Sequence, residues 1–125
     1  MNILITGGAG FVGKNLVRIM LKRGFKPQQI TVIDKDQKGI DYLKKYKINL
    51  LCDDLSTKGI WELNFRNQDL IINLAAQISA NDYLPFKKNN IDATKNIVEA
   101  AKKNKIKKII HFSSASVLSV RKDYY

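Results

Sequence analysis

Three glycines near the N-terminus, Gly7, Gly10 and Gly13, lie between an apolar run at 2–6 and an amphipathic stretch at 11–23. The run predicts a strand and the stretch predicts a helix, so the glycines form a strand-to-helix turn. Glycine permits a tight turn and a close approach of the backbone to a phosphate. The helix N-terminus adds unpaired N–H groups and a partial positive charge. This unit is typical of domains that bind the pyrophosphate of a dinucleotide.

An acid follows the glycines at the distance that such domains require. Asp34 ends the apolar run 30–34, about 20 residues beyond the last glycine. A carboxylate there accepts both ribose hydroxyls of NAD and repels the 2′-phosphate of NADP. Lys14 and Lys35 lie nearby in the sequence and weaken this preference. The strand, loop, helix and acid together predict a dinucleotide cofactor, with NAD favoured over NADP.

The rest of the chain alternates short β-branched runs with helical stretches, as parallel sheets with crossover helices do. We therefore expect one α/β domain over 1–125, a Rossmann-type three-layer α/β/α fold with strand order 3-2-1-4-5 that is truncated after strand five. We also expect Cys52 to end a buried strand and His111 to be a structural histidine on a buried strand. The expected strands are 2–6, 30–34, 48–52, 69–74 and 108–112, and the expected helices are 11–23, 39–46, 58–64 and 85–104.

The net charge of +11 raises polyanion binding as an alternative. Lysines cluster at 44–47 and 102–108 without the interleaved arginines and aromatics of a nucleic-acid site. The second cluster closes a helix, where cations favour the helix dipole. We therefore expect a solvated surface and no nucleic-acid partner. No apolar run approaches the ~20 residues that cross a bilayer, and one cysteine forms no internal disulfide, which favours a cytoplasmic protein without a membrane partner. No residues have the spacing of metal ligands.

The motifs, in their order along the chain, resemble those of the extended short-chain dehydrogenase/reductases. Within that group they resemble the NAD-dependent epimerase/dehydratase family, which includes UDP-glucose 4-epimerase. The segment 6–13 matches the family loop TGGxGFxG, and 73–76, 89–94 and 112–114 resemble its HLAA, NNVxGT and FSS segments. The resemblance implies NAD as cofactor and, in the full enzyme, a nucleotide-sugar substrate. Asp54-Leu55 resembles the pair beside adenine, with Asp53 as the alternative acid. The cofactor-binding residues implied by the glycine unit and the resemblance are Gly7, Gly10, Phe11, Val12, Gly13, Asp34, Lys35, Asp53, Asp54, Leu55, Leu74, Ala75, Ala76, Asn90 and Ser113.

The resemblance places Ser114 at the catalytic serine position, where it orients substrate. The family's proton transfer belongs to a YxxxK pair, whose lysine lowers the pKa of the tyrosine. No such pair follows Ser114 in this sequence. Tyr83 and Lys87 have the spacing, but they precede Ser114 and enclose Pro85, which we expect to prevent a regular helical turn. Tyr124 and Tyr125 follow Ser114 too closely to be the tyrosine of this pair. The sequence also departs from the family pattern in Ala93, which replaces a glycine, and in 117–119, which is VLS where the family has VYG.

Three hypotheses therefore stay open. The first is that the chain is the N-terminal, NAD-binding part of a nucleotide-sugar epimerase, dehydratase or dehydrogenase. This part would be inactive alone, and in the full enzyme a hydride would pass between a sugar carbon and the nicotinamide. The second is a naturally short, non-catalytic NAD-binding or interaction protein, for which the exposed edge of strand five suggests a homodimer. The third is polyanion binding through the lysine clusters, which predicts an affinity that falls steeply with salt.

Overall fold

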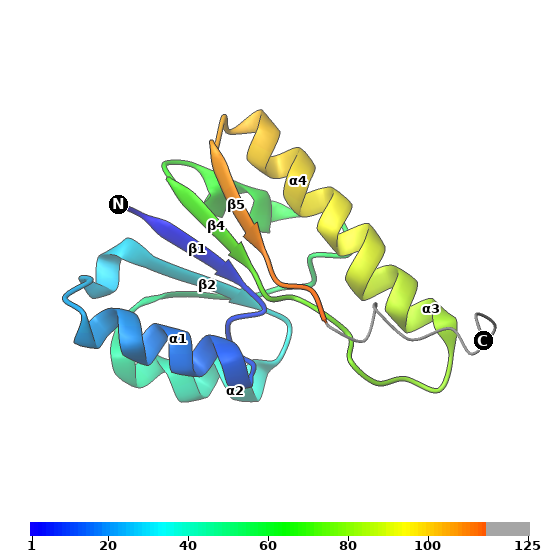
Figure 1. Cartoon of the computed structure of the whole chain (residues 1–125), viewed down its shortest axis with the longest axis horizontal. Coiled ribbons are helices and arrows are strands. Elements are labelled where there is room, and N and C mark those ends of the chain that lie inside the picture. The colour runs from blue at the N-terminus through cyan, green and yellow to red at the C-terminus, as the bar shows by residue number, and fades with distance from the viewer. Residues whose placement is uncertain (115–125) are drawn as a thin grey trace, which may run out of the picture.

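The computed structural model describes residues 1–114, which form one sheet of five parallel strands (Figure 1). The spatial order is β3-β2-β1-β4-β5, so the predicted strand order and the α/β class are confirmed. Thr6, Asp34 and Asn73 end neighbouring strands, and their carboxyl ends therefore meet at one edge of the sheet. The strands are β1 (Ile3–Thr6), β2 (Ile30–Asp34), β3 (Asn49–Cys52), β4 (Leu70–Asn73) and β5 (Lys108–His111).

Helices cover both faces of the sheet and make it the middle of three layers. Figure 1 shows α1 and α2 on one face and α4 on the other. The α-helices are α1 (Phe11–Lys22), α2 (Gln37–Leu43), α3 (Tyr83–Phe86) and α4 (Ala93–Lys103), and the segment η4 (Lys87–Asp92) is a π-helix. Three short 3₁₀ segments complete the chain: η1 (Pro27–Gln29), η2 (Lys44–Tyr46) and η3 (Ile60–Phe65).

Two apolar cores hold the layers together, one on each face of the sheet. Because side chains alternate along a strand, Ile3 and Ile5 of β1 enter the core beneath α1 while Leu4 enters the core beneath α4. Val17 of α1 and Ile97 of α4 are fully buried in these two cores. The central strands therefore read as continuous apolar runs, as strands buried on both faces do. Asn73 is nevertheless 2% exposed, and it accepts a hydrogen bond from the Thr6 hydroxyl at 2.7 Å.

The two outer strands differ from the expectation of burial. Cys52 ends β3 and is exposed, so the prediction that it ends a buried strand is wrong. His111 ends β5 and is exposed as well, although its Nδ1 lies 3.0 Å from Nδ2 of Asn73. Both strands are edges of the sheet, with a hydrogen-bonded neighbour on one side. An apolar run does not reveal from sequence alone that it lies at an edge.

The expected break at Pro85 is also absent. Pro85 lies in the first turn of α3, where its missing N–H leaves no helical hydrogen bond unmade. The helix continues directly into the π-helix η4 and then into α4 (Figure 1). The described residues do not include the segment 117–119, Tyr124 or Tyr125. No helix within 1–114 has the length and apolar character needed to span a membrane.

Candidate functional site

A cavity of about 360 Å³ opens at the carboxyl ends of β1, β2 and β4. Such a crevice in an open parallel sheet is where α/β proteins bind their ligands. Its lining brings together thirteen of the fifteen predicted cofactor-binding residues, all except Asn90 and Ser113. The lining residues are Gly7, Gly10, Phe11, Val12, Gly13, Asp34, Lys35, Asp36, Asp53, Asp54, Leu55, Leu74, Ala75, Ala76, Ile78, Asn89 and Ala93.

The three glycines of the loop have different reasons to be glycine. Gly7 has φ +69°, and a Cβ there would lie 2.5 Å from the backbone nitrogen of Ala75. A Cβ on Gly13 would lie 2.3 Å from the carbonyl oxygen of Gly8. Gly10 instead has φ −75°, and its Cβ would meet only the Gly7 carbonyl oxygen, at 3.5 Å. The fold therefore requires Gly7 and Gly13, whereas at Gly10 the free space belongs to the cavity.

The N-terminus of α1 faces the same cavity through Gly10, Phe11, Val12 and Gly13. Gly10 is the N-cap, and no side chain caps the helix. The first turn holds no acidic residue, so no carboxylate of its own neutralises the helix dipole. Phe11 and Val12 are exposed, and their backbone N–H groups have no partner within the helix. This end of α1 is thus suited to an anion.

Asp34 joins the end of β2 to the glycine loop. Its Oδ2 accepts the backbone N–H of Ala9 at 2.9 Å, and its Oδ1 accepts the N–H of Asp36 at 3.0 Å. Each carboxylate oxygen has a second lone pair, and the side chain lines the cavity. Asp34 is therefore held in place by the backbone while it can still accept hydrogen bonds from a ligand.

A second acidic pair, Asp53 and Asp54, follows β3 at the same edge of the sheet. Asp53 Oδ1 accepts the N–H of Asp54 at 2.8 Å, and Asp54 Oδ1 accepts the N–H of Ser56 at 2.9 Å. Partial burial raises the pKa of Asp54. Hydrogen bonding from Ser56 and the ammonium of Lys88, which lies 3.2 Å from the carboxylate, lower this pKa by more, so the pKa of Asp54 lies below its ordinary value. Both acids line the cavity, so the sequence alternatives for the residue beside adenine, Asp53 and Asp54, both stay open.

The π-helix η4 links the cavity margins through consecutive side chains. Asn89 Oδ1 accepts the ammonium of Lys35 at 2.8 Å, and Asn89 Nδ2 donates to Oε1 of Gln77 at 3.0 Å. Asn90 accepts the N–H of Gln77 at 2.6 Å and donates to its carbonyl at 3.1 Å, so it fixes the loop after β4. Asn89 lines the cavity and Asn90 does not, so the cofactor-binding role expected of Asn90 stays a prediction. Single π-turns often occur at functional sites.

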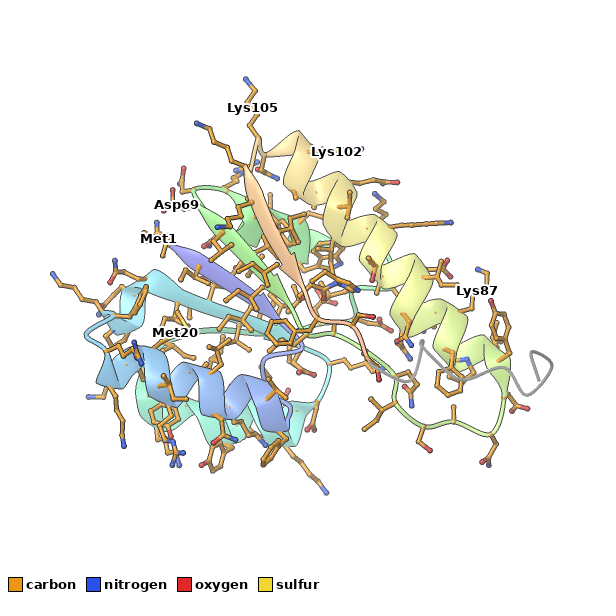
Figure 2. The ribbon with its side chains drawn as sticks, in the orientation of Figure 1. Met1, Met20, Asp69, Lys87, Lys102 and Lys105 are labelled. Carbon is orange, nitrogen blue, oxygen red and sulfur yellow. The ribbon has the colours of Figure 1, made fainter. Side chains whose placement is uncertain are left out.

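The remaining sequence candidates lie outside the cavity lining. Ser113 and Ser114 follow β5 and are exposed, and Tyr83 on α3 is 68% exposed. The ammonium of Lys14 lies 5.0 Å from the ring centroid of Tyr42, and both residues line a separate hollow with Phe11 and Asn15. The lysines at 102–108 end α4 and begin β5, so they lie at the opposite edge of the sheet from the cavity, as the positions of Lys102 and Lys105 in Figure 2 show.

Four lining residues were not predicted from sequence as cofactor contacts: Asp36, Ile78, Asn89 and Ala93. Asp36 caps α2, accepting the N–H of Lys38 at 3.1 Å, which is an ordinary structural role for an aspartate before a helix. Ile78 is 94% exposed, an unusual position for a large apolar side chain. For Asn89 the sequence signal is the Asn89-Asn90 pair, in which nothing local distinguishes the two asparagines.

The sequence of this chain matches that of a known protein family. A family model described as the NAD dependent epimerase/dehydratase family matches residues 3–123. The chain belongs to the NAD-dependent epimerase/dehydratase family.

Individual relatives agree with this assignment. The chain is 36% identical over 134 residues to dTDP-D-glucose 4,6-dehydratase of Dictyostelium discoideum, covering 92% of this chain and 29% of the relative. It is 33% identical to the bifunctional UDP-glucose 4-epimerase and UDP-xylose 4-epimerase 3 of Arabidopsis thaliana, covering 93% of this chain and 37% of the relative. The chain thus spans about a third of the length of these relatives.

A solved structure shows the same fold with a cofactor present. UDP-glucuronic acid 4-epimerase from Bacillus cereus, in complex with NAD, superposes with a TM-score of 0.80 at 28% identity. The superposition covers 97% of this chain and 42% of that protein. The expected Rossmann-type architecture is therefore confirmed both by the sheet topology and by a structural relative.

Proposed function

We propose that this chain is the NAD-binding part of a nucleotide-sugar epimerase or dehydratase. The observation that carries the proposal is the open position at Gly10, next to the uncapped N-terminus of α1 and at the same cavity as Asp34. The fold itself does not require a glycine at position 10. A glycine there is useful when another molecule must approach the backbone closely.

The residues present fit a dinucleotide at each of its parts. The glycine loop and the N-terminus of α1 would hold the pyrophosphate, since both offer backbone N–H groups to an anion. Asp34 would accept ribose hydroxyls with the lone pairs that Ala9 and Asp36 leave. Asp53 or Asp54, with Leu55, would lie beside adenine, and the backbone of Ala75 and Ala76 would flank the cofactor along β4.

Charge at the cavity supports NAD rather than NADP. Four lining residues are aspartates, Asp34, Asp36, Asp53 and Asp54, and Lys35 is the one cation among the lining residues of the described chain. The ammonium of Lys35 is bound to Asn89. A 2′-phosphate at the Asp34 ribose would meet carboxylate charge in a partly enclosed space, which disfavours it.

In the complete enzyme, the bound nicotinamide would accept a hydride from a sugar carbon and return it. Ser114 would orient the sugar and a tyrosine, while a YxxxK pair outside these 125 residues would move the proton. The substrate class rests on relatives that act on dTDP- and UDP-linked sugars. This chain alone would bind cofactor without turnover.

The exposed edge of β5 supports association with another polypeptide. Ile110 is 38% exposed and Phe112 is 50% exposed, and one side of β5 has no paired strand in the described sheet. Unpaired edges are usually covered, so the homodimer expected from sequence stays a proposal. Light scattering of the purified chain would show a dimer mass, and a monomer at high concentration would contradict it.

Titration of the purified 125-residue chain with NADH, followed by the fluorescence of the reduced nicotinamide, tests the proposal. We expect saturable binding by the wild type and weakened binding by Gly10→Ala, whose Cβ would occupy the cavity and meet only the Gly7 carbonyl oxygen, at 3.5 Å. Gly59→Ala is the control outside the cavity lining; its backbone is extended, but its Cβ would lie 3.3 Å from the Trp61 ring, so circular dichroism must first show that this variant is folded. Absence of NADH binding by a folded wild-type chain would contradict the proposal.

A further inference from the structure

We propose that Asn89 sets the cofactor preference of this site by holding the Lys35 ammonium away from the ribose-binding acid Asp34. The inference rests on the proposed function, since it concerns how the same cavity distinguishes NADH from NADPH. Asn89 lies in the π-helix η4, more than fifty residues from Asp34 in the chain, and would affect the preference between NADH and NADPH through Lys35.

The position of Lys35 makes it the cation that matters for a 2′-phosphate. Lys35 directly follows Asp34 at the end of β2, and both side chains line the cavity. No other lysine or arginine of the described chain lines it. A lysine at this place would compensate the repulsion between Asp34 and a 2′-phosphate if its ammonium were free to reach the phosphate.

The contacts of Lys35 show that the ammonium is engaged elsewhere. It donates to Oδ1 of Asn89 at 2.8 Å, across the cavity margin. The ion pairs within residues 1–114 join other lysines to acids, so Lys35 forms none with a described carboxylate. An ammonium that satisfies an amide oxygen leaves the charge of Asp34 uncompensated, and that charge then opposes the extra phosphate.

Asn89 is itself fixed, so it can hold a flexible lysine in one place. Its Nδ2 donates to Oε1 of Gln77 at 3.0 Å, and this orients the amide with Oδ1 toward Lys35. Asn90 fixes the backbone of Gln77 by two hydrogen bonds. The neighbouring Lys88 is bound to Asp54 at 3.2 Å, so this part of η4 is attached to the cavity margin at a second point.

The test is the ratio of the dissociation constants for NADPH and NADH, measured by fluorescence titration of the full 125-residue chain. Removing the amide oxygen in Asn89→Leu frees Lys35, and we expect the ratio of the NADPH to the NADH dissociation constant to fall about three- to fivefold, which is a gain in relative affinity for NADPH. The double variant Asn89→Leu/Lys35→Met should lose this gain. The gain should also shrink as NaCl is raised, because an exposed ion pair is screened.

Matched controls separate this effect from others. Gln77→Leu removes the hydrogen bond that orients the Asn89 amide but leaves Lys35 its acceptor, so the ratio should change in the same direction as in Asn89→Leu and by a smaller factor. Asn89→Leu/Lys38→Met removes the same charge from a lysine that does not line the cavity, and should keep the gain. If Asn89→Leu unfolds, as judged by circular dichroism, Asn89→Ser removes the same contact with a smaller polar side chain.

The outcomes distinguish this inference from the proposed function. An unchanged ratio in a folded Asn89 variant, or a gain that survives the loss of Lys35, would overturn the role of Asn89. A wild-type chain that binds neither nucleotide would overturn the proposed function instead.

Discussion

The carboxylate of Asp34 accepts the backbone N–H of Ala9 at 2.9 Å and so connects the end of β2 to the glycine loop 25 residues earlier. Ala9 is 1% exposed, so water does not replace this acceptor. One side chain therefore has two roles, the support of the loop and the recognition that we propose for ribose.

Substitutions of Asp34 should separate these roles. Asp34→Ala leaves the Ala9 N–H unpaired, which should lower the free energy of unfolding by about 1–3 kcal/mol and weaken NADH binding by about ten- to a hundredfold. Asp34→Asn keeps an acceptor for Ala9 but loses the charge, so it should be more stable than Asp34→Ala and discriminate less against NADPH. Urea denaturation and nucleotide titration measure the two effects. Equal NADH affinity in wild type and Asp34→Ala would exclude the ribose role.

Gly7 and Gly10 should respond in opposite ways to alanine. Gly7→Ala forces a side chain into the left-handed region, costing about 1–2 kcal/mol, and adds a collision with the backbone of Ala75. Gly10→Ala should unfold at the wild-type urea concentration while binding NADH less tightly. Fluorescence of Trp61, the one tryptophan of the chain, reports unfolding from inside the core. A Gly7→Ala protein as stable as the wild type would contradict the geometry of the loop.

Lys88 should contribute to the lowered pKa of Asp54, beside the hydrogen bonding from Ser56. The pKa of Asp54 is lowered in the folded state, so its contribution to stability is present above the ordinary aspartate pKa and is lost as the pH falls through the folded value. Lys88→Met should raise the pKa of Asp54 toward its ordinary value, as followed by carbon-13 NMR of the carboxyl group. Lys87→Met is the control, because Lys87 pairs with Asp92 instead. Identical titrations of Asp54 in wild type and Lys88→Met would refute the contact.

The buried pair Thr6 and Asn73 should show strong coupling. The Thr6 hydroxyl donates to Oδ1 of Asn73 at 2.7 Å, and the N–H of Ala75 donates to the same oxygen at 3.2 Å. Asn73→Leu leaves both donors unpaired and should cost about 1–3 kcal/mol. In the double variant Thr6→Val/Asn73→Leu the total should be smaller than the sum of the single losses, since the Thr6 hydroxyl is then gone and only the Ala75 N–H is left unpaired. Additive losses in urea denaturation would contradict the pairing.

The sequence predicted the topology well because the determinants of the central strands are local. Runs such as 2–6 and 30–34 are rich in Ile, Leu and Val, and Gly7 and Gly13 permit turns that ordinary residues would not. The glycine loop and Asp34 could be assigned together because their spacing follows from one strand-helix-strand unit.

Other features depend on neighbours that are distant in the chain, and sequence reasoning missed them. Cys52 and His111 lie on edge strands, and edge position follows from the order of the whole sheet rather than from either strand. The contact between Lys35 and Asn89 joins residues 54 positions apart. Asn89 lines the cavity and Asn90 does not, and no propensity distinguishes these two adjacent asparagines.

The central claim is that the cavity at the glycine loop binds NAD, and amide chemical-shift mapping with ¹⁵N-labelled chain tests it most directly. On addition of NAD⁺, we expect saturable chemical-shift changes of the backbone amides at the cavity, above all those of Gly10, Val12, Gly13 and Lys35. The amide shifts of the lysines at 102–108 should not change. Shifts confined to 102–108, or no shifts at millimolar NAD⁺ in a folded chain, would contradict it.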